Sequence, residues 1–198
     1  MARYTGPKDR LSRREGFDLF GKGIKFTRIN ITPGMHGPKG YSSRSQYGKQ
    51  LREKQKVKRM YGLMEKQFRK YVDMAFKSRG NTGNTLATHL ERRLDNIVFR
   101  LGFAPTRPSA RQLVSHRHIL VDGKKVNIAS YQVSVGQSIT LDNKSQAIPT
   151  IKKSLQDKVK VPGWLKRKAI VGIVDKFPTI DDVTEPVSMQ DIVEFYSR

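Results

Sequence analysis

The stretch from Thr106 to Asn127 limits the fold of this 198-residue chain more than any other. Thr106 can cap a helix, and Pro108 is tolerated in the first turn of one. The apolar residues that follow fall on one side of such a helix, at roughly 100° per residue, and should face a core: Ala110, Leu113 and Val114. The stretch therefore predicts a short amphipathic helix packed on other elements.

The opposite side of this helix is basic. Arg107, Arg111 and Ser115 follow one another at four-residue spacing, so their side chains share a face. We expect the two guanidinium groups and the hydroxyl to point into solvent or onto a ligand.

The residues after the helix favour a hairpin. Ile119 and Val121 alternate with more polar positions, Asp122-Gly123 supplies a tight turn, and Val126 resumes an extended segment. Helix and hairpin together should form a small positive surface.

The net charge of the chain restricts its possible binding partners. The chain has 39 Lys and Arg against 17 Asp and Glu, a net charge of +22, and a protein this basic usually meets a polyanion. Residues 1–60 hold 16 basic and 4 acidic side chains, residues 61–130 hold 13 and 5, and residues 131–198 hold 10 and 8. The polyanion should therefore bind the N-terminal and central parts. Residues 171–198, with 2 basic and 6 acidic side chains, suit solvent or a basic protein neighbour better.

The sequence carries no sign of a membrane protein. No apolar run approaches the roughly 20 residues of a membrane span, and no signal peptide follows Met1, so we expect a cytosolic protein. The absence of cysteine excludes disulfides and thiolate metal sites.

A specific resemblance begins at residues 91–95 (ERRLD) and continues through residues 106–127. This part of the chain resembles the RNA-binding module named after ribosomal protein S4. The module recurs in pseudouridine synthases, some tRNA synthetases and heat-shock RNA binders, so it implies RNA binding and no particular biology. We expect Glu91 and Asp95, four residues apart, to pair with nearby arginines.

The flanks resemble the S4 family of small-subunit ribosomal proteins itself. The motifs that carry this likeness are MARY at 1–4, GP at 6–7, SRREG at 12–16, PGMHG at 33–37, LREKQK at 51–56, QFRKY at 67–71 and VEFYSR at 193–198. Many family members place zinc-binding cysteines in the N-terminal arm. Asp9 and Ser12 stand here where a first cysteine pair would be, so the resemblance implies that the metal is lost.

The pattern over residues 49–78 predicts one long helix, which Gly80 can end. Its apolar residues recur at spacings of three, one or four and form a core-facing stripe: Val57, Met60, Tyr61, Met64, Phe68, Tyr71, Val72 and Ala75. The N-terminal half also carries lysines and arginines whose long stems would let charges reach phosphates. A solvated charged face is the alternative.

A turn at residues 81–84 should lead into a helix that Gly102 closes. The apolar side of that helix is formed by Leu86, Leu90, Leu94, Ile97, Val98 and Leu101. Residues 130–142 then favour one or two strands around a turn at Gly136. The alternating positions are Val133, Val135, Ile139 and Leu141.

The C-terminal third is less regular. Leu155 and Val159 allow a short helix, and the apolar run at residues 169–174 suits a strand. Trp164, the sole tryptophan, is expected to be a buried anchor rather than a platform for base stacking. Ser188 can cap a last helix, whose apolar residues are Ile192, Val193 and Tyr196.

No catalytic or metal site is expected. His116 and His118 flank a cationic residue and have no cysteine or acidic ligand nearby, so RNA contact or plain surface explains them better than a metal. The common nucleotide-binding, hydrolase and zinc-protease signatures are absent. The acidic pair Asp181-Asp182 is explained by a solvated turn. We therefore expect neither an enzyme nor a cofactor.

These expectations combine into an α+β fold. A helical N-terminal domain with an extended basic arm should accompany a mixed domain that contains a helix-helix-hairpin RNA-binding module. We place the arm at residues 1–47 and the helical domain at 48–90, joined by a C-terminal helix at 187–198. The mixed domain covers 91–186, with the module at 91–155.

The candidate RNA-binding residues are basic or hydrogen-bonding side chains of the arm, the long helix and the module. They are Arg3, Lys8, Arg10, Arg13, Arg14, His36, Lys39, Arg44, Tyr47, Arg52, Lys54, Lys56, Arg59, Arg69, Arg107, Arg111, Gln112, Ser115, His116 and His118. Recognition through such groups should follow RNA shape more than base sequence.

Three functions fit these features. The first is a structural RNA-binding protein of the ribosome. The second is an RNA-modifying enzyme that borrows the module, but it would need a catalytic domain longer than either flank. The third is a free RNA chaperone. Motifs from one end of the chain to the other favour the first.

The family resemblance implies a more detailed role. It implies binding to a multi-helix junction of small-subunit ribosomal RNA early in assembly, a place near the path by which mRNA enters the ribosome, and contact with neighbouring ribosomal proteins that affects decoding accuracy. The location would be the ribosome of the cytoplasm, or of an organelle matrix or stroma.

Overall fold

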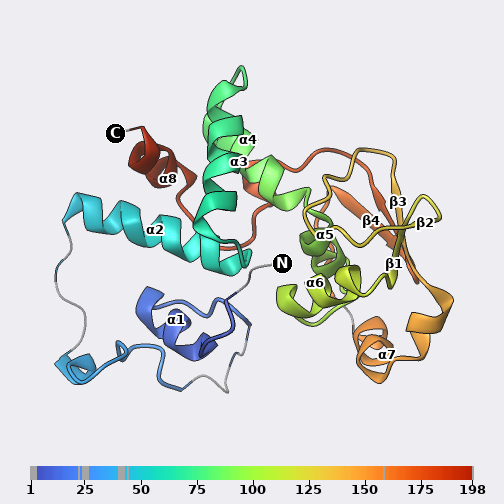
Figure 1. Cartoon of the computed structure of the whole chain (residues 1–198), viewed down its shortest axis with the longest axis horizontal. Helices are drawn as coiled ribbons and strands as arrows, with labels where there is room; N and C mark the ends of the chain where they lie inside the picture. Colours follow the sequence, from blue (N-terminus) through green and yellow to red (C-terminus); the bar gives the residue numbers. More distant parts are fainter. Residues whose placement is uncertain are drawn as a thin grey trace. The chain divides into compact units, whose positions relative to one another are not determined.

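The computed structural model describes residues 4–21, 23, 27–39, 43, 45–157 and 159–197. In these residues α-helices accompany a small antiparallel sheet (Figure 1), which confirms the α+β class. The chain divides into two compact units, one formed by residues 1–83 and 186–198 and the other by residues 84–185. Arg3 and Arg44, two of the candidate RNA-binding residues, lie outside the described residues.

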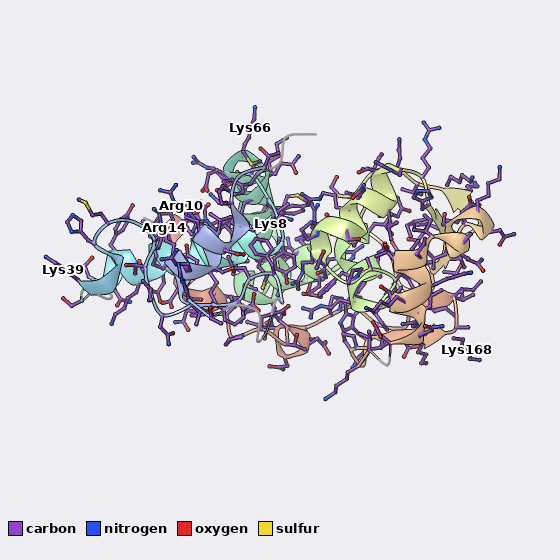
Figure 2. The ribbon with its side chains drawn as sticks, turned by 90° about the horizontal axis from the view of Figure 1, so that it is seen from below. Lys8, Arg10, Arg14, Lys39, Lys66 and Lys168 are labelled. Carbon is purple, nitrogen blue, oxygen red and sulfur yellow. The ribbon has the colours of Figure 1, made fainter. Side chains whose placement is uncertain are left out.

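The first unit is built from helices and their connections. They are α1 (Lys8–Glu15), the 3-10 helix η2 (Gly37–Lys39), α2 (Gln46–Met60), α3 (Glu65–Lys77) and α8 (Met189–Tyr196). Lys8, Arg10 and Arg14 extend from α1, and Lys39 from η2, as Figure 2 shows.

The prediction of one helix over residues 49–78 is wrong, because α2 ends at Met60 and α3 begins at Glu65. Gly62 has a φ of 63°, in the left-handed region that glycine adopts most readily. The Gly62 amide donates to the Arg59 carbonyl at 3.0 Å and the Leu63 amide to the Lys58 carbonyl at 2.9 Å. These paired bonds form a Schellman motif, which ends α2.

The predicted apolar stripe is buried on both sides of this break, except at Met64. Its buried members are Val57, Met60, Tyr61, Phe68, Tyr71, Val72 and Ala75. The stripe therefore continues from one helix to the next, which is why the apolar spacing alone does not reveal the interruption.

The C-terminal helix α8 packs against α2 (Figure 1). Gln50 Nε2 donates to Glu194 Oε2 at 2.8 Å, and the Tyr196 hydroxyl donates to Glu65 Oε1 at 2.7 Å. The predicted cap is confirmed, since the Ser188 hydroxyl accepts a hydrogen bond from the Asp191 amide at 3.3 Å.

The second unit contains the sheet and the helices around it. Its elements are the end of α4 (Thr82–Glu91), α5 (Leu94–Arg100), α6 (Arg107–Ser115), β1 (Ile119–Val121), β2 (Lys124–Lys125), β3 (Ser138–Leu141), η3 (Asn143–Ala147), α7 (Pro149–Gln156), β4 (Leu165–Lys168), β5 (Val171–Val174) and η4 (Ile180–Asp182). The strands are antiparallel neighbours in the order β2-β1-β3-β5-β4.

Two helix boundaries differ from the sequence-based expectation. The turn expected at residues 81–84 is instead the start of α4 at Thr82. The single helix expected to run to Gly102 is interrupted at Arg92 and Arg93, so α4 and α5 are separate. Arg93 pairs with Gln132 in an isolated β-bridge, and this pairing takes the backbone out of the helix.

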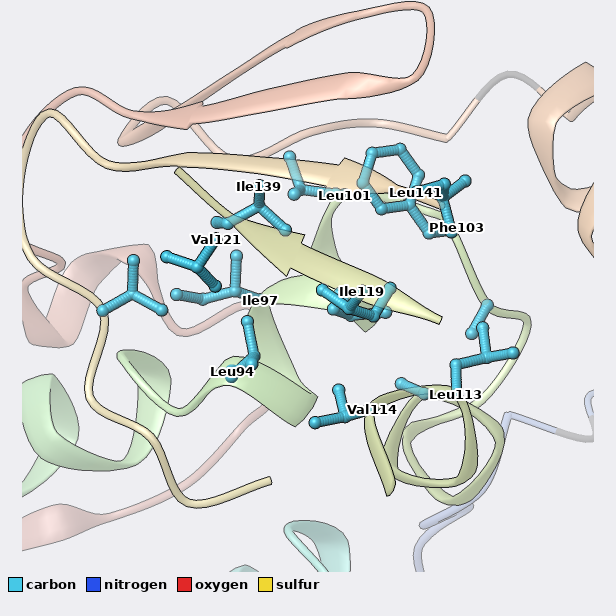
Figure 3. Packing of buried hydrophobic residues seen from close by; sticks show 14 of the residues in the cluster. Leu94, Ile97, Leu101, Phe103, Leu113, Val114, Ile119, Val121, Ile139 and Leu141 are labelled. Carbon is cyan, nitrogen blue, oxygen red and sulfur yellow. The ribbon is translucent and has the colours of Figure 1, made fainter. Parts of the chain in front are cut away.

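The core of the second unit lies between one face of the sheet and the helices α5 and α6. Figure 3 shows apolar side chains of the two helices meeting those of the strands. They include Leu94, Ile97, Leu113, Val114, Ile119, Val121, Ile139 and Leu141. The predicted inward side of α6 is thus confirmed, and Thr106 caps the helix by accepting from the Ser109 amide at 3.3 Å.

Trp164 is fully buried in this core, as expected of an anchor. The strand expected over residues 169–174 begins only at Val171, because Ala169, with a φ of 49°, belongs to the turn that joins β4 to β5. Val135 likewise lies in a turn and is exposed, although alternation suggested a strand position.

Candidate nucleic-acid interface

The arginines of α6 do not point into solvent, which corrects the expectation for Arg107 and Arg111. The Arg107 side chain is only 11% exposed; its Nε donates to Asn96 Oδ1 at 2.9 Å and its guanidinium pairs with Glu185 Oε1 at 2.6 Å. The same guanidinium lies 4.7 Å from the centre of the Phe99 ring. Packing and pairing thus occupy this side chain within its own unit.

Arg111 is held in the same way. Its side chain is 13% exposed, and its Nε and terminal nitrogen donate to Asp95 Oδ2 at 2.9 Å and 2.7 Å. Asp95 also accepts two hydrogen bonds from Arg93, at 3.0 Å and 2.8 Å. Both arginines therefore brace the module in this structure.

A second cluster of buried charges joins α5 to the chain after η4. Arg100 pairs with Glu91 at 2.8 Å and with Glu185 at 2.7 Å. Burial by itself would raise the pKa of Glu185, but the charges of Arg107 and Arg100 and their hydrogen bonds outweigh it and hold that pKa at about 2. The expectation that Glu91 and Asp95 pair with nearby arginines is confirmed.

The C-terminal end of α6 does remain open to solvent. Gln112, Ser115 and His116 are exposed and share one side of the helix, and the exposed Arg117 follows them. His118 is half-buried, and its Nδ1 lies 2.7 Å from the Ser145 hydroxyl. Hydrogen-bonding groups of the module therefore gather at this end.

The N-terminal arm presents further exposed groups. Lys8, Arg10, Arg14, His36 and Lys39 are all exposed. The Lys8 ammonium also lies 5.7 Å from the centre of the Phe20 ring, a contact that positions its stem without neutralising its charge.

Arg13 is an exception in this arm, because it serves the fold. It donates to the carbonyls of Ile31 at 2.8 Å and Thr32 at 3.1 Å, tying α1 to residues that follow it in the sequence. The buried Ser12 hydroxyl accepts a hydrogen bond from the Leu19 amide at 3.4 Å. Ser12 thus braces the turn after α1, at a position where the family resemblance implied a missing metal ligand.

The basic side of α2 is largely engaged within the first unit. Glu15, whose side chain is 1% exposed, pairs with both Arg52 and Arg59. Lys54 is buried; it donates to Glu65 Oε1 at 2.8 Å and lies 4.6 Å from the centre of the Phe195 ring.

Lys56 is engaged as well. It donates to the Pro186 carbonyl, lies 3.5 Å from Glu53 Oε1, and stands 5.0 Å from the centre of the Phe17 ring. Arg69 of α3 and Tyr47 of α2 are exposed. The centre of the Tyr47 ring lies 5.5 Å from the centre of the Phe195 ring.

Sequence reasoning missed some exposed cations. Lys66 and Lys168, labelled in Figure 2, are exposed, as is Arg117. Lys66 and Lys168 lie outside every motif and have no signal in the sequence beyond their charge. Arg117 is distinguished in the sequence only by its place between two histidines.

Metal and membrane sites are not found in the described part of the chain. Among those residues, no three or more His, Cys, Asp or Glu side chains are grouped so that they could hold a metal ion. Across the same residues, no helix combines the length and apolar character needed to cross a membrane.

Comparisons with known proteins agree with this picture. Residues 3–91 match the family described as "Ribosomal protein S4/S9 N-terminal domain", and residues 92–139 match the S4 domain. Similar proteins include the small ribosomal subunit protein uS4 of Geotalea daltonii at 49% identity, of Trichlorobacter lovleyi at 48% and of Natranaerobius thermophilus at 46%. Each match covers 100% of this chain and 100% of the relative.

The two family matches together span most of the chain, and the relatives are similar to it over its full length. Ribosomal proteins of this kind are structural and non-enzymatic, so the RNA-modifying enzyme is set aside. The chain belongs to the S4 family of small ribosomal subunit proteins.

Proposed function

We propose that this protein is a primary RNA-binding protein of the small ribosomal subunit, which clamps a multi-helix junction of the ribosomal RNA and so nucleates assembly. The observation that carries the proposal is the set of exposed cations on the described part of the arm. Lys8, Arg10, Arg14 and Lys39 have charges directed to solvent in a segment that is strongly basic overall. Such a surface favours phosphates, because neutralising them releases bound counterions.

The finer parts of the role rest on family membership. They are a position near the path by which mRNA enters the ribosome, contact with neighbouring small-subunit proteins and an influence on decoding accuracy. The relatives named above are bacterial, which supports a ribosome of the bacterial cytoplasm. The segment 171–198, which has more acidic than basic side chains, is suited to a basic protein neighbour.

The candidate residues divide into two groups within this proposal. The exposed ones are the direct RNA contacts that we propose: Lys8, Arg10, Arg14, His36, Lys39, Tyr47, Arg69, Gln112, Ser115 and His116. The others form hydrogen bonds or ion pairs within the protein, and we propose that they mainly stabilise the structure that presents the RNA contacts: Arg13, Arg52, Lys54, Lys56, Arg59, Arg107, Arg111 and His118.

Binding should weaken steeply with salt. Residues 1–130 hold 29 basic and 9 acidic side chains, so neutralisation of about six to ten phosphates is reasonable. We expect the logarithm of the affinity for small-subunit ribosomal RNA to fall with the logarithm of salt concentration at a slope above about four in magnitude. Filter binding between low and moderate salt measures this slope, and a value near one would contradict an extended phosphate-binding surface.

A matched pair of variants tests the location. Arg10→Ala with Arg14→Ala should reduce the slope by about two, because two exposed cations are lost from α1. Lys176→Ala removes an exposed cation from the acidic C-terminal part and should leave the slope unchanged. Sedimentation on sucrose gradients distinguishes a ribosomal protein from a free RNA chaperone. A ribosomal protein moves with small subunits, whereas a chaperone would stay in a free pool.

A further inference from the structure

Arg117 has a backbone conformation that is unusual for its residue type. Its φ is 62°, in the left-handed region, where a side chain with a Cβ crowds the neighbouring carbonyl. It lies two residues after the end of α6, where the His118 amide donates to the Leu113 carbonyl at 3.0 Å and the Arg117 amide to the Val114 carbonyl at 3.0 Å. This pairing is a Schellman motif with Arg117 at its left-handed position.

The same chain closes two other helices with this motif and uses glycine there. Gly62 ends α2 with a φ of 63°, and Gly102 ends α5 with a φ of 72°. After α5 the Phe103 amide donates to the Val98 carbonyl at 3.1 Å and the Gly102 amide to the Phe99 carbonyl at 2.9 Å. At α6 the chain therefore carries a strained arginine in a position that glycine fills without strain.

The fold gives this arginine no acidic partner in the part of the chain that the structure describes. Arg117 is exposed, and the acids that directly follow β1 and β3 are already engaged. Asp142 pairs with Lys125 at 3.2 Å, and Asp122 accepts hydrogen bonds from Gln137 and from the Ser138 amide. This differs from Arg107 and Arg111, whose charges are matched inside the module.

The surroundings of Arg117 suit an anion. Ser115, the last residue of α6, and His116 precede it and are both exposed, and the exposed Lys124 lies in the edge strand β2 of the hairpin that follows. A guanidinium can donate two parallel hydrogen bonds to a phosphate, and a hydroxyl or an imidazole beside it can add a third.

We propose that Arg117 is a direct phosphate-binding residue for ribosomal RNA, which the Schellman motif holds at the end of α6. The left-handed backbone turns the chain sharply between α6 and β1, so the guanidinium stands at the boundary of the two elements together with Ser115 and His116. This inference rests on the proposed function, because it names a contact within the same RNA-binding role.

An alternative explanation is that the charge of Arg117 stabilises α6. The C-terminal end of a helix carries a partial negative charge that cations offset, and the last turn of α6 contains no Lys or Arg. In that case, however, removal of the arginine would lower the stability of the protein and leave RNA binding unchanged. The two explanations therefore predict opposite patterns.

The test compares Arg117→Gly with Ala169→Gly. Ala169 is also left-handed, with a φ of 49°, is exposed in the β4–β5 turn and carries no charge. Both substitutions relieve the same kind of backbone strain, so each should raise the melting temperature by about 2 to 4 °C. Only Arg117→Gly should weaken binding to small-subunit ribosomal RNA of the same organism, by roughly tenfold, and reduce the salt slope by about one.

Arg117→Lys completes the set. It keeps the charge but not the planar, two-pronged donor, so it should restore the salt slope and recover only part of the affinity. If Arg117→Gly binds the RNA as tightly as the unmodified protein at every salt concentration, the inference is wrong while the proposed function stands. Failure of the unmodified protein to bind the RNA would overturn both.

Discussion

Helix α6 packs one face into the core, while Arg107 and Arg111 on the other face form ion pairs with Glu185 and Asp95. The inward positions Ala110, Leu113 and Val114 follow from helical periodicity and are buried as predicted. The outward arginines were expected to be free, yet Arg107 meets Glu185, which lies 78 residues further along the chain. No local pattern predicts that partner, because only the tertiary fold brings it near.

The position of Arg107 changes the expected effect of removing it. Arg107→Ala leaves Glu185 with Arg100 and the Thr184 hydroxyl as partners, and leaves Asn96 Oδ1 without this donor. We expect a loss of about 1 to 3 kcal/mol in the free energy of unfolding, measured by urea denaturation. Leu113→Ala, a buried truncation on the other side of the helix, should cost about 2 to 5 kcal/mol.

Gln112→Ala serves as the control on the same helix, because its side chain is exposed and its loss should change stability little. Unchanged stability of Arg107→Ala would instead place that arginine in solvent and restore the original expectation that it is free to contact RNA.

At the scale of elements, the sequence predicts which segments are helical better than where they end. Apolar spacing runs through Gly62 and through Arg92 without a visible break, because both neighbouring helices bury the same stripe. The strand β4 (Leu165–Lys168) was missed, since its sequence LKRK shows almost no apolar alternation and its pairing with β5 defines it. Helix N-caps are easier to predict from sequence, because Thr106 and Ser188 accept hydrogen bonds from amides only three positions away.

Charge pairing between elements gives the second unit a specific response to acid. Glu185 has its pKa lowered from 4.5 to about 2, so its ionised form stabilises the fold fully above about pH 4.5. This contribution is lost as pH falls from about 4.5 to about 2. We expect Glu185→Gln to lose about 2 to 3 kcal/mol at neutral pH and to show a shallower decline in stability across that acid range.

Denaturant melts at several pH values measure this difference. Asp181→Asn removes an exposed carboxylate outside the cluster and should follow the unmodified protein at each pH. Parallel curves for Glu185→Gln and the unmodified protein between pH 4.5 and pH 2 would show that another group governs the acid response.

Over the whole molecule, charge and motifs were the most informative features of the sequence. They predicted an RNA-binding member of a ribosomal family, and the family is confirmed over the full length of the relatives. They did not distinguish contacting cations from structural ones, because a charge count treats the exposed Arg14 and the engaged Arg59 alike. The division into an arm at 1–47, a helical domain at 48–90 and a mixed domain at 91–186 stays a prediction.

The arm should need no zinc. Cysteine is absent, and other contacts brace the segments around α1. The Ser12 hydroxyl accepts a hydrogen bond from the Leu19 amide, and Glu15 forms ion pairs with Arg52 and Arg59 of α2. We expect purified protein to contain no stoichiometric zinc by elemental analysis and to keep its melting temperature after treatment with a chelator. Zinc bound at one ion per chain and resistant to chelation would contradict this expectation.

The single tryptophan makes the two units spectroscopically unequal. Trp164 is fully buried among the apolar residues of the second unit, and the first unit has none. Tryptophan emission therefore reports the exposure of one core only, whereas circular dichroism sums the helices of both units. Fluorescence and dichroism traces that separate during heating or refolding would reveal which unit loses or gains its structure first, without any added label.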